Sequence, residues 1–104
     1  MELSEVTDIV TEAIQGKLIV EVDYIREEDG VKTCRLMEPF DVAAGQRSKT
    51  GEKKFWGWCL YHDRIEQKTI ENIISIKITD QYFDPKIREQ GFSSVPKYEV
   101  ARNW

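Results

Sequence analysis

The hydrophobic period of this chain changes once, at Gly16, and no other feature of the sequence constrains its fold as strongly. Over residues 2–15 the apolar side chains recur at helical spacing and gather on one face of a predicted amphipathic helix. Gly16 is typical of the position just past a helix end. From residue 17 onward apolar and polar residues alternate, which is the pattern of strands with one buried face. The sequence therefore predicts one helix followed by strands.

Short strands separated by turns follow this helix. Residues 17–26 form the first strand, and Asp29-Gly30 marks the tight turn of a hairpin. Pro39 is expected to end or bulge the second strand. The aromatic segment 55–61 is expected to be buried on both faces or close to it. The remaining predicted segments are 31–38, an extended piece at 40–44, 65–70, and a last strand carrying Ile74, Ile76 and Ile78.

One helix and five short strands favour a small barrel, because closing the sheet removes exposed edges and the helix can pack across one end. A length of 104 residues allows a single domain. We predict the helix and barrel over residues 1–80 and a C-terminal extension over 81–104. Residues 84–90 of this extension are expected to form a short helix. The rest offers few apolar anchors: Phe92, Val95, Tyr98, Val100 and Trp104.

The reactive side chains are too few for a recognisable catalytic or metal site. His62 is the only histidine, and no acid or amide stands near it at the spacing of a known catalytic motif. The spacing Cys59-x-x-His62 is compatible with a metal, but Cys34 is the only further Cys or His, and a zinc site takes three or four such ligands. We therefore expect no enzyme, no cofactor and no metal. The chain has no apolar run long enough to span a membrane, so we expect a cytoplasmic protein.

Basic residues gather in one predicted loop of an otherwise acidic chain. The net charge of −4 argues against nonspecific binding to nucleic acid. Residues 46–54 nevertheless carry four bases against one acid, a local charge of +3, and lie beside the aromatic segment 55–61. Such a loop could contact phosphates while the aromatics stack on bases, or it could be a solvated hairpin beside core aromatics. The predicted anion contacts are Arg47, Lys49, Lys53 and Lys54.

Several short motifs occur in an order that indicates a known family. The helix end at residues 13–16 leads into a strand at 20–24 and then the hairpin at Asp29-Gly30. The later motifs are Arg35-Leu36-Met37-Glu38-Pro39-Phe40, Gly57-Trp58-Cys59 and Ile70-Glu71-Asn72-Ile73. From Val6 to Ile78 the chain thus resembles the WYL domain, a Sm/SH3-like barrel found mostly in bacterial transcription regulators. The resemblance implies a module that senses or binds nucleic acid or other anionic ligands.

The chain departs from this family at positions that carry its ligand chemistry. The triplet that names the family falls on Lys53-Lys54-Phe55. Leu60 follows the cysteine, where the family has a basic or imidazole residue. Thr69 and Asn72 stand where the family has the Arg pair of its ligand-binding face. A helix-turn-helix domain normally precedes the barrel, and a single helix precedes it here, so the resemblance implies a stand-alone sensor or a protein partner that supplies DNA binding.

The sequence thus predicts a mainly β fold, a five-stranded Sm/SH3-like barrel with an N-terminal α-helix. Its predicted function is non-enzymatic ligand sensing or regulation, with a small anionic ligand or a short single-stranded nucleic acid as partner. The residues expected to line the pocket are Tyr24, Arg35, Trp58 and His62. Arg35 would meet an anionic group, Trp58 would stack, and the other two would donate hydrogen bonds. The sequence is nearly as consistent with Tyr24 and Trp58 as plain core residues. The alternative function is a protein–protein adaptor that uses exposed aromatics.

Overall fold

Helix α1 (Leu3–Gly16) opens the structure, a computed structural model that describes residues 1–45, 48–88 and 99–102. The Glu5 carboxylate accepts a hydrogen bond from the backbone N–H of Glu2, which stabilises the first turn (3.1 Å). The helix ends one residue later than predicted. Gly16 is its last helical residue, and Lys17 takes the left-handed conformation with φ of 56°. The backbone N–H of Lys17 donates a hydrogen bond to the Ile14 carbonyl (3.1 Å). This bond offsets the cost of the left-handed conformation in a residue that has a side chain.

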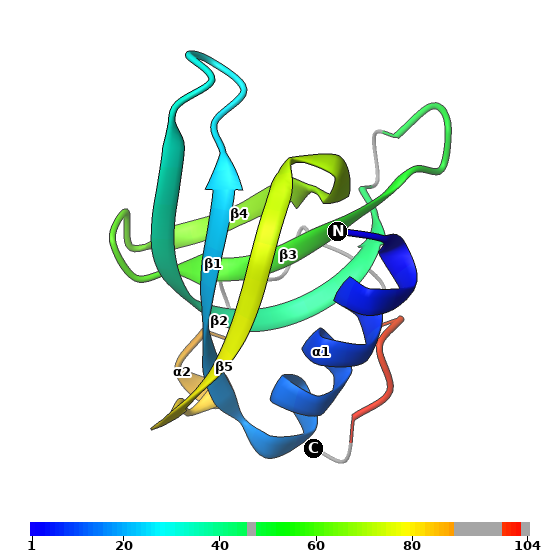
Figure 1. Cartoon of the computed structure of the whole chain (residues 1–104). Helices are drawn as coiled ribbons and strands as arrows, with labels where there is room; N and C mark the ends of the chain where they lie inside the picture. Colours follow the sequence, from blue (N-terminus) through cyan, green and yellow to red (C-terminus); the bar gives the residue numbers. More distant parts are fainter. Residues whose placement is uncertain (46–47, 89–98, 103–104) are drawn as a thin grey trace.

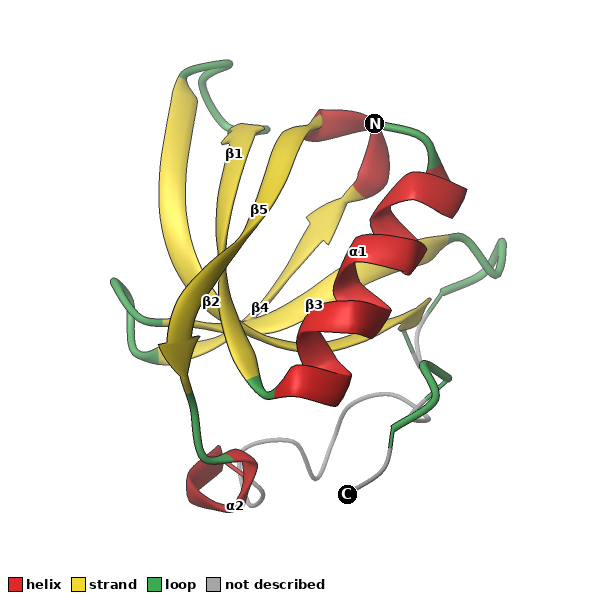
Figure 2. Cartoon of the chain, turned by 60° about the horizontal axis from the view of Figure 1, so that its bottom comes forward, coloured by secondary structure: helices red, strands yellow, loops and turns green. Residues whose placement is uncertain are grey.

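Five antiparallel strands form a single sheet, which confirms the predicted mainly β fold with an N-terminal helix. The order across the sheet is β4-β3-β2-β1-β5. The sheet curls toward a barrel (Figure 1). Within the described ranges no ladder joins β4 to β5, so this barrel is partly open. Figure 2 shows α1 lying across this curled sheet. The bounds are β1 (Leu18–Ile25), β2 (Lys32–Ala44), β3 (Lys53–Cys59), β4 (Arg64–Thr69), a 3₁₀ turn η1 (Ile70–Asn72) and β5 (Ile73–Tyr82).

Three local predictions need correction or completion. Of the two outcomes predicted for Pro39, the structure shows the bulge and not the strand end: β2 continues to Ala44, with a register shift between Pro39 and Asp41 in its pairing with β3. Strand β3 is not buried on both faces, because Trp56 and Trp58 are only half-buried while alternate residues point into the core. In β5, Ile73 faces the core and Ile74 is exposed, since a shift in pairing with β1 places Ile73 opposite Tyr24.

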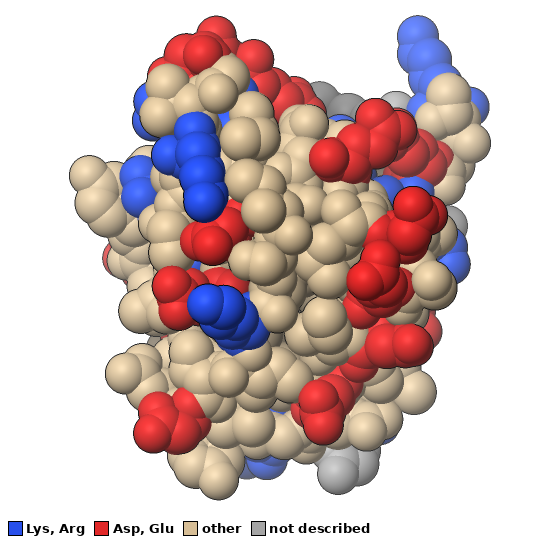
Figure 3. All heavy atoms as spheres, in the orientation of Figure 1, with Lys and Arg blue, Asp and Glu red and all other residues tan. Residues whose placement is uncertain are grey.

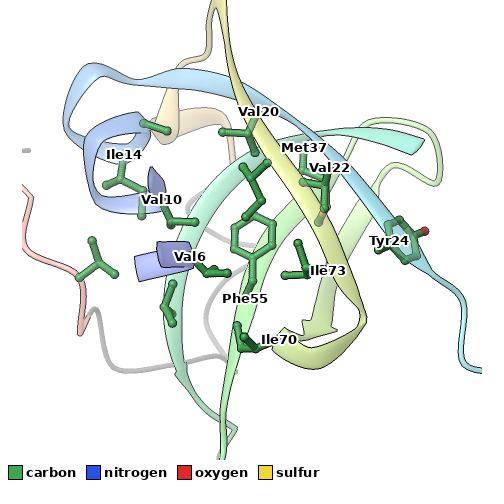
Figure 4. Close-up of a cluster of buried hydrophobic side chains, with 14 of the residues drawn as sticks. Val6, Val10, Ile14, Val20, Val22, Tyr24, Met37, Phe55, Ile70 and Ile73 are labelled. Atoms are coloured by element: carbon green, nitrogen blue, oxygen red, sulfur yellow. The ribbon is translucent and has the colours of Figure 1, made fainter. Parts of the chain in front are cut away.

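The core lies between α1 and the concave face of the sheet. Val6, Val10 and Ile14 of α1 are fully buried, and Figure 4 shows them facing the ring of Phe55 from β3. Tyr24 belongs to the same buried cluster and lies at its edge in this view. The other core side chains of the sheet and of η1 are Val20, Val22, Met37, Val42, Cys59, Ile70, Ile73 and Ile76. The predicted apolar face of the helix is therefore the face that closes the barrel.

A buried carboxylate attaches the C-terminal residues to the sheet. The Asp41 side chain accepts hydrogen bonds from the backbone N–H groups of Glu99 and Val100 (3.0 and 2.9 Å). Val100, one of the predicted anchors, is 4% exposed. The predicted short helix forms as α2 (Pro85–Arg88). The other predicted anchors, Phe92, Val95, Tyr98 and Trp104, lie outside the described residues. No helix among the described residues is long and apolar enough to cross a membrane.

Candidate functional site

A groove of about 800 Å³ opens between the end of β1, the following turn and strand β4. The turn at residues 26–28 forms one wall, and strand β4 forms the other. The groove carries four Lys or Arg side chains, three Glu side chains and the only histidine, so its surface is strongly polar. The charged residues among its lining are Arg26, Glu27, Glu28, Lys54, His62, Arg64, Glu66 and Lys68.

Glu66 is the centre of the charged wall. Its Oε2 lies 2.8 Å from His62 Nδ1 and 3.1 Å from Arg64 Nε, and its Oε1 lies 3.1 Å from Lys68 Nζ. Burial by itself raises the pKa of Glu66, but the hydrogen bond and charge of Lys68, with Arg64 and His62, outweigh it and hold the pKa below its usual value. Glu66 is therefore an anion at neutral pH that fixes three basic side chains in the groove.

Lys68 joins this ion cluster to the aromatic floor. Its Nζ lies 4.0 Å from the centre of the Tyr24 ring, in a cation–π contact. The Lys68 side chain is 13% exposed, so both of its contacts are largely shielded from water. This shielding strengthens both contacts, since charges interact more strongly away from solvent.

Thr69 and Asn72, which stand where the resembled family has two Arg, also line the groove and bind an acid of the same chain. Thr69 Oγ1 and Asn72 Nδ2 both donate to Glu27 Oε1, at 2.7 and 3.2 Å. Two neutral donors therefore stand where the resemblance implies two cations, and both of them contact a carboxylate. This part of the groove would repel an anionic group and accept a hydrogen-bond donor.

The four residues predicted to share a pocket are divided by the structure. Tyr24 and His62 line the groove, whereas Arg35 and Trp58 do not belong to its lining. The Arg35 guanidinium lies 4.1 Å from the centre of the Tyr61 ring, and its Nη1 donates to the Cys34 carbonyl (2.9 Å). The Trp58 indole donates to Asp63 Oδ1 (3.1 Å). Trp58 lies on the opposite face of β3 from Cys59, because neighbouring strand residues alternate.

The predicted basic contacts are also separated. Lys54 lines the groove, while Lys53 lies 3.8 Å from the Glu99 carboxylate in an exposed ion pair. Lys49 is exposed in the loop between β2 and β3, and Arg47 lies outside the described residues. Of the three predicted contacts that the structure describes, only Lys54 is therefore placed in the groove.

The sequence reading missed the charged face of β4. Arg64, Glu66 and Lys68 recur at every second position, so they share one face of a strand. That alternation was visible in the sequence. The importance of this charged face could not be predicted, because an isolated charged face of a strand is normally a solvated surface. Only the curl of the sheet turns this face toward Tyr24.

Comparison with known proteins gives a likeness of fold. No family model and no curated protein matches the sequence. A solved structure, the proteasome accessory factor B/C (PafBC) of Arthrobacter aurescens, matches with a TM-score of 0.65 and 18% sequence identity. The match covers 74% of this chain and 12% of the PafBC chain. The likeness shows that the two chains share a fold over the matched part, and this chain corresponds to a small part of the larger protein.

Proposed function

We propose that this chain is a non-enzymatic ligand-sensing module of WYL type, with its ligand in the groove. The observation that carries the proposal is the position of the groove. Residues 69 and 72, where the resembling family has the Arg pair of its ligand face, both line it. The motif order of the sequence and the fold likeness to PafBC, which contains a WYL domain, support the same reading.

Two cations of the groove, Lys54 and Arg64, favour a ligand that carries an anionic group. Lys54 has no ion-pair partner among the residues that the structure describes. The Arg64 side chain is 67% exposed, so it can leave Glu66 for a ligand at little cost. On the opposite wall, Glu27 and Glu28 offer acceptors to a donor group of the same ligand. The ligand that fits best is therefore a small anionic molecule that also carries hydrogen-bond donors.

A thermal-shift screen of anionic metabolites and short single-stranded oligonucleotides tests this proposal. We expect at least one small anion to raise the melting temperature of the wild-type protein, with an effect that falls as salt is added. Lys54→Ala and Arg64→Ala should weaken binding of that ligand. Lys77→Ala, which removes an exposed lysine of β5 outside the groove, is the matched control. The proposal fails if no ligand shifts the melt, or if the control weakens binding as much as the groove variants.

A protein–protein adaptor is the second candidate, favoured by exposed apolar side chains near the end of β5. Tyr82 and Ile87 are 76% and 70% exposed, although large apolar residues are normally covered. In this reading a partner protein covers these side chains and contributes a DNA-binding domain. Tyr82→Ser combined with Ile87→Ser should then abolish partner capture while leaving ligand binding in the groove unchanged.

A further inference from the structure

Three side chains of the β3–β4 hairpin bring together a thiol, an imidazole and a carboxylate. Cys59 ends β3, His62 lies in the turn, and Glu66 lies in β4. The Cys59 Sγ lies 3.6 Å from His62 Nδ1, and that nitrogen lies 2.8 Å from Glu66 Oε2. One ligand atom from each residue lies within 4.8 Å of the other two. From this geometry we propose that Cys59, His62 and Glu66 bind one divalent zinc-like cation.

The distances suit a tetrahedral ion with little rearrangement. Ideal bonds to zinc separate a sulfur and a nitrogen ligand by about 3.5 Å, and Sγ and Nδ1 are 3.6 Å apart. A nitrogen and an oxygen ligand would lie about 3.4 Å apart, so Nδ1 and Oε2 must separate from 2.8 Å. The His62 side chain is 36% exposed and lies in a turn, so it can make this movement.

The scaffold around the three ligands is rigid. Cys59 is fully buried, and the Glu66 side chain is 10% exposed. Gly57 lies opposite Glu66 in the ladder, and a Cβ at Gly57 would come within 3.0 Å of the Glu38 carbonyl oxygen. The close approach of β2 to β3 thus fixes the strand that carries Cys59. Two of the three ligands are therefore held in place before any ion arrives, which lowers the entropy cost of binding.

The charge balance also permits the ion. Binding releases the Cys59 thiol proton to solvent and leaves the remaining imidazole proton of His62 on Nε2. A thiolate and a carboxylate then neutralise the two charges of the cation. Lys68 can keep its contact with Glu66 Oε1, while the exposed Arg64 gives up Oε2 to the metal. His62 and Glu66 line the groove, so a fourth coordination position would face it.

A second cluster, formed by Glu21, Asp23 and Cys34, provides the internal control. The thiol of this cluster belongs to Cys34. Its hydrogen bonds to the carboxylates of Asp23 and Glu21, together with burial and the charges of these carboxylates, raise the pKa of Cys34 to about 12. A thiol with so high a pKa resists conversion to the thiolate that a metal needs. Only the thiol of Cys59 is expected to bind.

Titration of the chelator-treated, reduced protein with Co²⁺ tests the site. We expect one equivalent to bind with a thiolate-to-cobalt charge-transfer band, and Zn²⁺ to remove that band by displacement. Cys59→Ser should abolish the band, whereas Cys34→Ser should retain it. His62→Ala and Glu66→Gln should lower Zn²⁺ affinity at least as much as loss of an outer hydrogen-bond partner, about 10- to 100-fold. Glu71→Gln, at an exposed carboxylate of η1, is the control for Glu66.

Three results of the cobalt titration would overturn the proposal. They are a wild-type protein that gives no charge-transfer band, a band that survives in Cys59→Ser, and a band that disappears in Cys34→Ser. Because Cys59 is buried, its replacement can also unfold the hairpin. His62→Ala changes an exposed side chain, so this variant is expected to remain folded. Unchanged Zn²⁺ affinity in folded His62→Ala would contradict the site.

Discussion

Asp41 shows how one buried carboxylate can organise a segment distant in sequence. It is fully buried, and it accepts hydrogen bonds from its neighbour Val42 and from Glu99 and Val100, about sixty residues later in the chain. The guanidinium of Arg102 lies 3.9 Å away and donates to the Phe40 carbonyl. Three backbone donors therefore depend on a single side chain for their hydrogen bonds.

We expect Asp41→Ala to destabilise the protein strongly. Each buried N–H left without a partner costs about 1–3 kcal/mol, and three are affected. Since the released segment can recover some bonds with water, the expected loss of unfolding free energy is about 2–4 kcal/mol. Urea unfolding measures it. Asp80→Ala, at an exposed position of β5, should change stability little, and an equal loss in both variants would contradict the role given to Asp41.

Glu66 should make the stability of the protein sensitive to acid. Its pKa is lowered in the folded state, so the folded protein binds its proton less readily than the unfolded chain does. Its contribution is therefore present above the ordinary Glu pKa and is lost as the pH falls below that value and through the lower folded pKa. Urea unfolding across this window should show a shallower pH dependence in Glu66→Gln. An unchanged slope would contradict the prediction.

At the scale of elements, α1 completes the core by packing its apolar face against the curled sheet (Figure 2). Four residues of the helix are fully buried, and its acidic residues form a row on the outer surface (Figure 3). The two faces of the helix therefore have separate roles, packing on one side and solvation on the other.

We expect α1 to be an inseparable part of the fold. Ile14→Ala should cost about 2–5 kcal/mol, the usual range for a buried large-to-small change, because Ile14 is fully buried. Leu3→Ala, in the same helix at a 42% exposed position, should stay within about 0.5 kcal/mol of wild type. Deletion of residues 1–15 should abolish cooperative unfolding. A truncated protein with an unchanged melt would show that the barrel is stable alone.

At the scale of the whole molecule, the charge distribution is acidic outside and mixed in the groove. The net charge is −4, and the acidic row of α1 faces solvent. The four cations of the groove share it with three carboxylates and with the neutral side chains of Thr69 and Asn72. Among the described residues, the groove thus offers a mixed surface and not a broad basic one that could follow a phosphate backbone.

We therefore expect no tight binding of duplex DNA by this chain. Phosphate contacts by Lys and Arg supply most nonspecific affinity, and they weaken steeply as salt rises. Gel-shift or anisotropy measurements should detect little binding at about 0.15 M salt. Weak binding of short single strands, reduced by Lys54→Ala, would remain consistent with the groove. Tight sequence-specific duplex binding would contradict this prediction.

The sequence by itself determined the elements and their order. Hydrophobic period distinguishes a helix from a strand within a few residues, so α1, β1 and the hairpin at Asp29-Gly30 were predicted correctly. The same local signal identified the buried face of α1. Pro39 was predicted to end or bulge its strand, and the structure shows the irregularity. The shift that buries Ile73 was not predicted, because register depends on the partner strand.

Only the tertiary structure decided which side chains meet. Tyr24 from β1, Lys54 from β3 and Glu66 from β4 line one groove because the sheet curls, and no period in the sequence encodes that curl. The same holds for Asp41 and the residues of 99–102 that it binds. Arg35 and Trp58 carry suitable chemistry but lie outside the groove. Secondary structure follows from neighbours in the chain, whereas a site is made by contacts between distant residues, whose geometry is fixed only when the whole core packs.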